Sequence, residues 1–220
     1  MKNSSCLVVF SGGQDSTTCL HWAMKRFKDV QAIFFQYGQR HQKEECAAHL
    51  IADLNKIKLH TFPLDFFKHL GGNALVNSNI PIEANSQELP NTFVPGRNLL
   101  FLTCAASFAY NEGIQDLITG VCQTDYSGYP DCRENTIKSL NQTISLGLNK
   151  DFTIHTPLMH LNKAESVRLA VQLKAMDSLR HSHTCYEGVY PPCGNCPSCL
   201  LRAKGFKEAG IIDPLLPKVN

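Results

Sequence analysis

The stretch Ser11-Gly12-Gly13-Gln14-Asp15-Ser16 decides how this 220-residue chain is interpreted. It follows a short apolar run, Leu7–Phe10, typical of a buried strand, and leads into an amphipathic helical pattern, Ser16–Phe27. Paired glycines permit positive φ and close approach by a ligand, and a helix start presents unpaired N–H groups and the positive end of its dipole. The turn therefore predicts a phosphate or pyrophosphate site. An ordinary strand-to-helix turn with a Ser or Asp cap is the simpler alternative.

The turn does not match the two commonest nucleotide motifs. No Gly-Lys-Ser or Gly-Lys-Thr follows the glycines, as a Walker A loop requires. The glycine spacing is also not that of the dinucleotide-binding fingerprint. The class of nucleotide site must therefore be inferred from wider features of the chain.

Strand and helix patterns alternate along the rest of the chain. Further strands are expected at Val30–Phe35, Leu59–Pro63, Asp116–Val121 and Thr153–Pro157, and further helices at Gln42–Leu54, Asn98–Tyr110, Asn135–Leu148 and Lys163–Lys174. This alternation predicts an α/β fold with a parallel sheet covered on both faces, and ligands at the carboxyl ends of its strands. Asn98–Tyr110 is apolar almost all round and is expected to lie buried between layers. The Asn-, Gly- and Pro-rich segment Gly71–Gly96 is expected to be a lid or disordered.

Composition and charge exclude several classes of protein. The chain is 43% hydrophobic, enough for a core in one domain with a small appendage, and its net charge of +2 is not that of a dedicated nucleic-acid binder. The opening MKNSSCLVVFSGG has too few apolar residues for a signal-peptide core. No stretch approaches the roughly 20 apolar residues of a spanning helix. We therefore expect no membrane partner and a cytoplasmic location.

The ten cysteines fall into two groups. Six are scattered, mostly within apolar segments, and are expected to behave as small buried hydrophobes in a reducing compartment. The other four have C-x7-C-x2-C-x2-C spacing and are Cys185, Cys193, Cys196 and Cys199. Four thiolates at this spacing suit a tetrahedral zinc ion, and a full set leaves no open position, so the site is expected to be structural. An iron–sulfur cluster is the alternative.

The hexapeptide at residues 11–16 resembles the SGGxDS loop of the PP-loop ATP pyrophosphatases. The resemblance implies an adenine-nucleotide α-hydrolase-like fold on a five-stranded parallel sheet. It also implies cleavage of ATP between its α and β phosphates, with adenylation of a substrate oxygen. The residues that it places around the phosphates are Ser11, Gly12, Gly13, Asp15 and Ser16. It further implies that Asp15 helps to hold Mg²⁺.

Positive charge is expected beside the α-phosphate, because the transition state there is negatively charged. Arg97 stands where the long loop meets a helix, and Lys163 begins a helix just after a strand. Both resemble basic positions of the PP-loop family, although a solvated charge is the ordinary interpretation of either. We expect these two residues to be catalytic together with Ser11, Asp15 and Ser16.

A polar loop, Asp125–Arg133, follows the strand expected at Asp116–Val121. Its aromatic residues can stack on a flat heterocycle, and a carboxylate can accept from the adjacent N–H and NH₂ groups of a guanine-like ring. We expect Tyr126, Asp131 and Arg133 to bind substrate, with Asp131 on the guanine-like edge. An ordinary strand-to-helix loop is the alternative.

Longer segments narrow the family. Phe10–Leu20, Tyr37–His41, Val94–Asn98, Tyr126–Arg133 and the four-cysteine segment each resemble the 7-cyano-7-deazaguanine synthases of queuosine biosynthesis, over about residues 7 to 202. The ATP-binding residues that this implies are Phe10, Ser11, Gly12, Gly13, Gln14, Asp15, Ser16, Thr17, Thr18, Cys19 and Leu20. We expect an ATP-binding α/β domain over residues 1–180 and a zinc-binding segment over residues 181–220 packed on it.

The resemblance also implies the reaction. ATP adenylates the carboxylate of 7-carboxy-7-deazaguanine, and ammonia displaces AMP to give the amide. A second ATP activates the amide oxygen, and loss of AMP leaves the nitrile. The chain has no recognisable glutaminase portion, so free ammonia is the expected nitrogen source.

Two other functions are weighed against this one. An enzyme that adenylates a base in intact tRNA would need a basic docking surface or a sulfur-carrying thiol pair, and the charge and the clustered cysteines favour neither. A non-enzymatic zinc protein would use the glycine loop only as a turn. The family resemblance suggests a homodimer, to which the apolar tail Ile211–Leu216 either contributes or packs back on its own domain.

Overall fold

The computed structural model describes residues 3–77, 79–82, 89–123 and 128–216. At its centre is a five-stranded sheet in which every pair is parallel, with strand order β3-β2-β1-β4-β5. The strands are β1 (Asn3–Val9), β2 (Phe27–Gln36), β3 (Lys58–Pro63), β4 (Asp116–Ile118) and β5 (Thr153–His155). The α/β class and the parallel sheet predicted from the sequence are confirmed.

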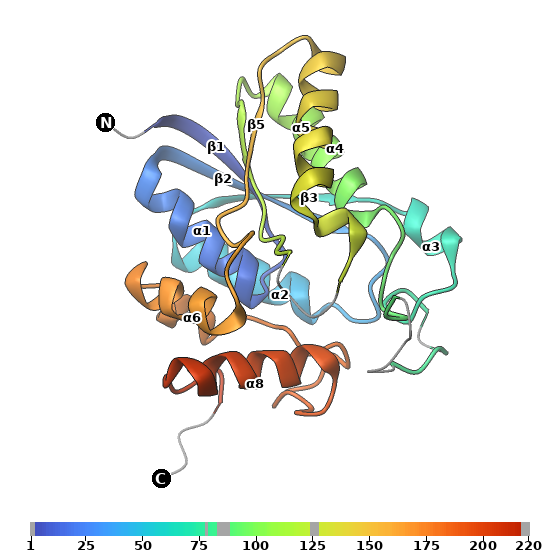
Figure 1. Cartoon of the computed structure of the whole chain (residues 1–220), viewed down its shortest axis with the longest axis vertical. Helices are drawn as coiled ribbons and strands as arrows, with labels where there is room; N and C mark the ends of the chain where they lie inside the picture. The colour runs from blue at the N-terminus through green and yellow to red at the C-terminus, as the bar shows by residue number, and fades with distance from the viewer. Residues whose placement is uncertain (1–2, 78, 83–88, 124–127, 217–220) are drawn as a thin grey trace.

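Helices cover both faces of this sheet (Figure 1). The longer ones are α1 (Gln14–Arg26), α2 (Lys43–Leu54), α4 (Arg97–Asn111), α5 (Glu134–Leu148), α6 (Lys163–Gln172) and α8 (Pro197–Ala209). The short ones are α3 (Phe66–Leu70), the 3₁₀ turn η1 (Pro130–Cys132) and α7 (Met176–Leu179). Within the described residues, no helix has the length and apolar character needed to span a bilayer.

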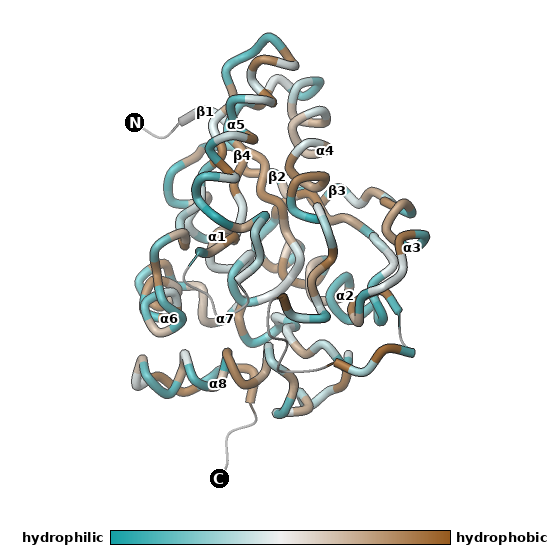
Figure 2. The backbone as a smooth tube through the Cα atoms, turned by 45° about the vertical axis from the view of Figure 1, so that its right-hand side comes forward, coloured by the Kyte–Doolittle hydropathy of each residue, from teal (hydrophilic) through white to brown (hydrophobic). Residues whose placement is uncertain are grey.

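The alternation of side chains along β1 divides the core into two halves. Cys6 and Val8 point toward α1 and α2, whereas Leu7 points toward α4 and α5. Both halves are closed by small and aliphatic side chains from the covering helices, such as Ala48 and Ala105. Strand β2, next to the central strand β1, is correspondingly among the brown, hydrophobic segments of Figure 2. Burial on both faces explains why the strands appear in the sequence as unbroken apolar runs.

The structure differs from the sequence prediction at several elements. α1 begins at Gln14, two residues earlier than expected, because the second glycine of the loop already stands at the N-cap. β4 and β5 are shorter than predicted, since the chain leaves the sheet after three residues in each. α4 covers one face of the sheet instead of lying between layers, and its Tyr110 is 46% exposed. The expectation of a fully buried helix at that position was wrong.

The C-terminal region packs against α6. α8 runs below α6 in Figure 1, and the two share a hydrophobic cluster with α7 that includes Val167, Leu179 and Phe206. Ile211 joins this cluster and Leu215 is buried, so the tail folds back on its own chain, while Ile212 stays 86% exposed. The division of the chain at residue 180 stays a prediction.

Candidate active site

A large cavity opens at the carboxyl ends of the central strands. Its volume is about 770 Å³, within the usual range for ligand sites. The loops after β1 and β4 both line it, and these neighbouring strands mark the point where the strand order reverses. Ligands of open α/β sheets bind at such a point. The sequence prediction of a site beside the glycine loop therefore coincides with the cavity.

The glycine loop is held in a tight, internally bonded shape. Ser16 Oγ donates to the carbonyl of Gly13 at 3.2 Å and lies 3.1 Å from Ser11 Oγ, and the Gly13 N–H donates to Ser11 Oγ at 3.3 Å. Gly12 has φ +74°, and a Cβ there would lie 2.6 Å from the backbone nitrogen of Ala48 in α2. Only glycine fits that position, which explains the first of the paired glycines.

Two further glycines let backbone and side chains approach this loop. A Cβ on Gly120, just after β4, would lie 3.1 Å from the backbone of Asp15 and Ser16. A Cβ on Gly205 of α8 would lie 2.6 Å from Cγ of Lys163. The start of α1 is thus packed closely from the β4 side, and Lys163 is packed closely from the C-terminal helix.

Asp15 and Lys163 form the charged centre of the loop. The Lys163 ammonium donates to Asp15 Oδ2 at 2.6 Å, with the lysine side chain only 11% exposed. Asp15 Oδ1 is buried and has no hydrogen-bond partner among the described residues. A buried carboxylate oxygen without a partner is costly unless a ligand satisfies it. One oxygen of Asp15 is therefore available to a cation or a donor that enters the cavity.

The remaining residues predicted to bind nucleotide divide into two groups. Phe10, Ser11, Gly13, Gln14, Asp15 and Ser16 line the cavity. Both amide atoms of Gln14 are buried without a partner in the described structure, so this cavity-lining residue has a donor and an acceptor left for a polar ligand. The cavity lining does not include Gly12, Thr17, Thr18, Cys19 or Leu20. Cys19 and Leu20 pack in the core, and Thr18 Oγ1 donates to the Gln14 carbonyl at 2.9 Å.

A second polar cluster lines the same cavity, and we call it the aromatic box. Its members come from the loop after β2, from α2 and α4, from the loop before α5, and from residues 181–199, which we call the cysteine segment. They are Tyr37, Glu44, Arg97, Tyr129 and Tyr186. The Arg97 guanidinium lies 5.5 Å from the centre of the Tyr37 ring and donates to its hydroxyl at 3.3 Å. The Tyr129 hydroxyl is bonded to Thr92 Oγ1 at 2.7 Å.

Burial shapes the acid–base properties of the box. It raises the pKa of Glu44 to about 7, against the opposing effect of the Arg97 charge. It also raises the pKa of Tyr37 to about 12 and that of Tyr186 well above its usual range. Near neutral pH the phenols of Tyr37 and Tyr186 are therefore neutral, beside the permanent charge of Arg97 and a Glu44 carboxyl poised between its two states. Sequence reasoning did not single out Glu44 or Tyr186.

The residues predicted to bind substrate lie in different environments. Asp131 is buried, and its Oδ2 accepts from the backbone N–H and the side-chain amide of Asn98, both at 3.0 Å. It satisfies a free N–H group at the start of α4 and is not part of the cavity lining. Arg133 is exposed at the N-cap of α5. Tyr126 lies outside the described residues.

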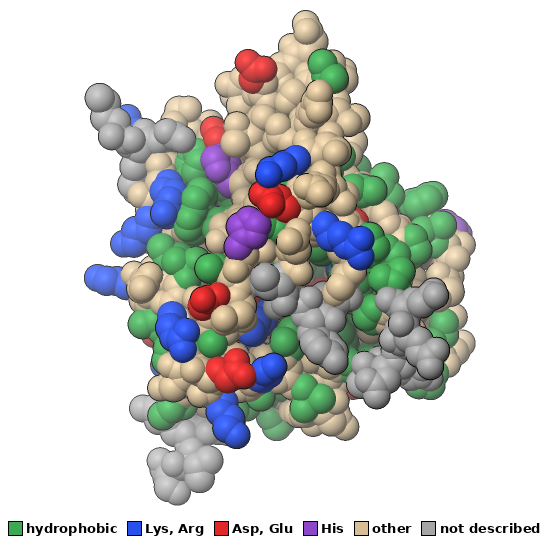
Figure 3. All heavy atoms as spheres, viewed as in Figure 1, with side chains coloured by type: hydrophobic (Ala, Val, Ile, Leu, Met, Phe, Trp, Pro, Cys, Tyr) green, Lys and Arg blue, Asp and Glu red, His purple; other side chains and the backbone are tan. Residues whose placement is uncertain are grey.

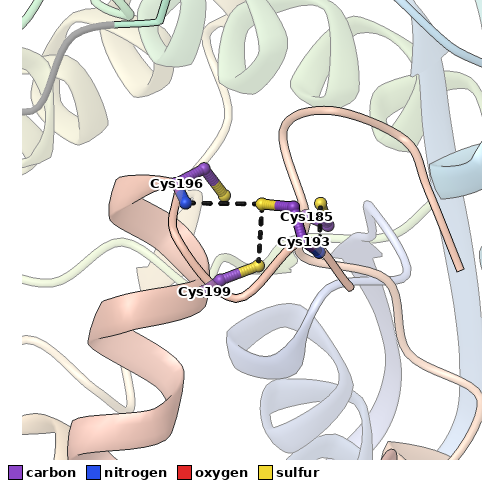
Figure 4. A group of neighbouring side chains, drawn as sticks. All are labelled: Cys185, Cys193, Cys196 and Cys199. Atoms are coloured by element: carbon purple, nitrogen blue, oxygen red, sulfur yellow. Dashed lines mark hydrogen bonds between the residues drawn. The ribbon is translucent and has the colours of Figure 1, made fainter. Parts of the chain in front are cut away.

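The four clustered cysteines converge as the spacing predicts. The sulfurs of Cys185, Cys193, Cys196 and Cys199 all lie within 4.8 Å of one another, close enough to hold one metal ion (Figure 4). Three come from the loop and Cys199 from the first turns of α8. The Cys193 and Cys196 N–H groups donate to Cys185 and Cys193 sulfurs at 3.4 and 3.3 Å. Burial opposes ionisation of Cys193, yet the amides of Asn195 and Cys196 lower its pKa to about 7.

The cysteine segment also touches the glycine loop directly. The His183 N–H donates to the Gly12 carbonyl at 3.0 Å, and the His183 ring bonds to the Cys185 carbonyl at 2.9 Å. Thr184, Tyr186, Ser198 and Lys204 from this part of the chain line the cavity. Order in the cysteine segment therefore determines one wall of the cavity. The sequence carried no sign of this contact, because the two segments are about 170 residues apart in the chain.

Comparison with known proteins agrees with this geometry. The family model described as "Queuosine biosynthesis protein QueC" matches residues 5–210. The chain is 55% identical to a 7-cyano-7-deazaguanine synthase of Chromobacterium violaceum, covering 99% of this chain and 95% of the relative. It is 50% identical to one of Bacillus subtilis, covering 94% and 96%.

Solved structures support the fold at much lower identity. A 4-thiouridine synthetase in complex with RNA and ATP aligns with a TM-score of 0.53 and 16% identity, covering 94% of this chain and 50% of that one. An NMN synthetase from Francisella tularensis aligns with a TM-score of 0.51 and 14% identity, covering 94% and 72%. At such identities the likeness concerns the fold alone. The family match over nearly the whole length, together with the PP-loop and the four cysteines, shows that this chain belongs to the QueC family of queuosine biosynthesis proteins.

Proposed function

We propose that this chain is an ATP-dependent ligase that converts 7-carboxy-7-deazaguanine and ammonia to 7-cyano-7-deazaguanine. The carboxylate and then the amide oxygen are activated as adenylates, with release of AMP and pyrophosphate. The observation that carries the proposal is the cavity itself. It joins a PP-loop, in which Asp15 Oδ1 and the Gln14 amide lack partners, to an aromatic box that can enclose a flat heterocycle.

The residues around the PP-loop fit the nucleotide. No side chain caps α1, and the residues of its first turn line the cavity, so the start of this helix offers N–H groups to a phosphate. The unpartnered Asp15 Oδ1 is the atom that would hold Mg²⁺, which prefers oxygen ligands and bridges phosphates. Lys163 keeps a positive charge against the loop, and Arg97 adds a second one within the same cavity. These two cations would stabilise charge that develops on the α-phosphate.

The four cysteines would hold zinc. Four thiolates satisfy a tetrahedral ion completely, so the ion would act by ordering the segment that forms the cavity wall. Elemental analysis should find one zinc per chain and a colourless protein. A brown protein with iron and acid-labile sulfide would instead identify the iron–sulfur alternative, and a metal-free, folded and active protein would exclude both.

Three further features belong to the same proposal. Free ammonia would supply the nitrogen, the enzyme would work in the cytoplasm, and it would form a homodimer. The exposed Ile212 at the tail is a candidate contact for a second copy, since its neighbours Ile211 and Leu215 are already packed on their own chain.

Incubation with 7-carboxy-7-deazaguanine, ammonium, ATP and Mg²⁺ tests the reaction, with products identified by mass spectrometry. Nitrile and AMP are expected, and release of ADP would exclude the proposed chemistry. ATP/pyrophosphate exchange driven by tRNA and not by the small base would favour the tRNA-modifying alternative. Over the middle and lower part of the face drawn in Figure 3, acidic and basic side chains lie close to one another.

A further inference from the structure

We propose that Glu44 is the residue that selects a guanine-like base, by accepting hydrogen bonds from its ring N–H and exocyclic amino group. The inference rests on the proposed function, since it assigns the recognition of that substrate within the same cavity. It also replaces the expectation that Asp131 performs this role. Three observations carry it.

The first observation concerns which carboxylate groups line the cavity. Within the described residues, only Asp15 and Glu44 contribute carboxylates to the cavity lining. Asp15 is bonded to Lys163 in the PP-loop, where the phosphates are expected. Asp131 lies outside the lining and is bonded twice to Asn98. A base that enters this cavity therefore meets one carboxyl group whose oxygens are not already used, that of Glu44.

The second observation is the shape and polarity around Glu44. The rings of Tyr37, Tyr129 and Tyr186 line the same part of the cavity, and a flat heterocycle is the ligand that such rings accommodate best. Tyr37 is itself fixed by the edge-on rings of Phe67 and Phe101, with centres 6.1 and 5.4 Å away. The Tyr37 side of the box is therefore held in place by packing before a ligand arrives.

The third observation is that Arg97 influences Glu44 without neutralising it. The two charges interact, yet no ion pair joins them, and the guanidinium is directed instead to the Tyr37 hydroxyl and ring. Glu44 is consequently half-buried, only partly compensated in charge, and in need of hydrogen-bond donors. Adjacent N–H and NH₂ groups on one edge of a ring satisfy both oxygens of a carboxylate at once.

The size of the expected preference between the two bases follows from the free-energy cost of leaving a buried polar group without a hydrogen bond. A site built to hydrogen-bond a substrate group discriminates strongly against an analogue that lacks it, by factors of roughly 10⁴ in favourable cases. Because Glu44 would make two bonds and the analogue removes one donor, we expect a preference of about 100-fold for the aminated base.

The test compares 7-carboxy-7-deazaguanine with 7-carboxy-7-deazahypoxanthine, which lacks the amino group. For the unchanged enzyme, kcat/KM should favour the aminated base about 100-fold. In Glu44→Gln that preference should shrink to less than about fivefold, with the KM for ATP changed by less than threefold. The matched control is Glu45→Gln, because Glu45 is bonded to Gln36 at 2.7 Å and does not line the cavity. The control should keep the full preference.

Two results would overturn the assignment. One is a Glu44→Gln enzyme that still discriminates between the bases, and the other is an equal loss of affinity for base and ATP. If the unchanged enzyme makes no nitrile, the proposed function fails separately. Equilibrium binding of 7-cyano-7-deazaguanine and its deamino analogue to the same variants then still decides the role of Glu44.

Discussion

At the scale of single residues, the contact between Lys163 and Asp15 joins two parts of the sequence that were predicted independently to be catalytic. The lysine begins α6 and the aspartate lies in the first turn of α1, and the 2.6 Å contact brings both to the cavity. The pair is more than a surface salt bridge, because it is largely buried and the second oxygen of Asp15, Oδ1, still lacks a hydrogen-bond partner.

Lys163→Met should lower kcat/KM for ATP-dependent AMP release by about 10² to 10³, the usual cost of removing one group that stabilises transition-state charge. The methionine fills the same space against α8, so the far-UV dichroism should not change. Lys174→Met is the control, because Lys174 is exposed and is not part of the cavity lining. Equal activities for the two variants would remove Lys163 from the active site.

The raised pKa of Glu44 predicts how binding depends on pH. The groups that act on it are the permanent Arg97 charge and the phenols of Tyr37 and Tyr186, which stay neutral below pH 9. With a pKa of about 7, Glu44 is mostly neutral at pH 6 and mostly ionised at pH 8. The affinity for the base should therefore rise about tenfold across this interval. Calorimetric titration of the unchanged enzyme and of Glu44→Gln checks this, and an equally steep dependence in the variant would contradict it.

The raised pKa of Glu44 also makes the stability of the folded protein depend on pH. The folded-state pKa lies above the ordinary value of 4.5, so folding favours the protonated carboxyl. The stability that this contributes is present at low pH and is lost as the pH rises from about 4.5 to about 7. Glu44→Gln should for that reason stabilise the protein more at pH 8 than at pH 5.

At the scale of helices and strands, the close crossing of α8 over Lys163 links the cysteine segment to the reaction. Gly205 allows it, since a Cβ would lie 2.6 Å from Lys163 Cγ. Gly205→Ala should therefore displace the lysine and lower kcat at least tenfold, with less effect on the KM for the base. The matched control is Gly147→Ala in α5, where a Cβ meets nothing within 4 Å. That variant should gain roughly 0.5–1 kcal/mol of stability and keep its activity.

How far the sequence predicts the site depends on whether a residue acts through its local pattern. The PP-loop was predictable because paired glycines between a strand and a helix have few other uses. The cysteine cluster was predictable because metal binding requires that spacing. Glu44 was not, because an acidic residue in the first turn of a helix is expected from the helix dipole alone. That Asp131 binds substrate stays a prediction, and the sequence does not show that one of its oxygens is bonded to Asn98 at the start of α4.

Element lengths show the same limit. β4 ends early because Thr119, Gly120 and Val121 after it line the cavity, a requirement of the site and not of strand propensity. α8 begins inside the cysteine cluster, with Pro197 in its first turn, since helix formation there brings Cys199 to the other sulfurs. Tertiary contacts decided these boundaries, and the apolar pattern could not reveal them.

At the scale of the whole molecule, the buried ion pair between Arg202 and Asp213 connects the parts of the C-terminal region. Arg202 of α8 donates to both Asp213 oxygens, at 2.6 and 2.8 Å, to Ser182 Oγ at 2.8 Å and to the Leu179 carbonyl at 3.3 Å. Its side chain is 4% exposed and that of Asp213 is 7% exposed. The pair thus connects α7, the cysteine segment, α8 and the tail, and through them the wall of the cavity.

Asp213→Asn should lower the free energy of unfolding by about 3–5 kcal/mol, because it leaves the buried Arg202 charge without its partner. Urea unfolding followed by far-UV dichroism measures the loss. The control is Glu208→Gln, which removes one member of the exposed Lys204–Glu208 pair at 3.9 Å and should change stability by less than about 0.5 kcal/mol. A loss below 1 kcal/mol in Asp213→Asn would mean that water or other groups solvate Arg202. The tail would then be dispensable, and the order of the cysteine segment would depend on its metal and its contact with the PP-loop alone.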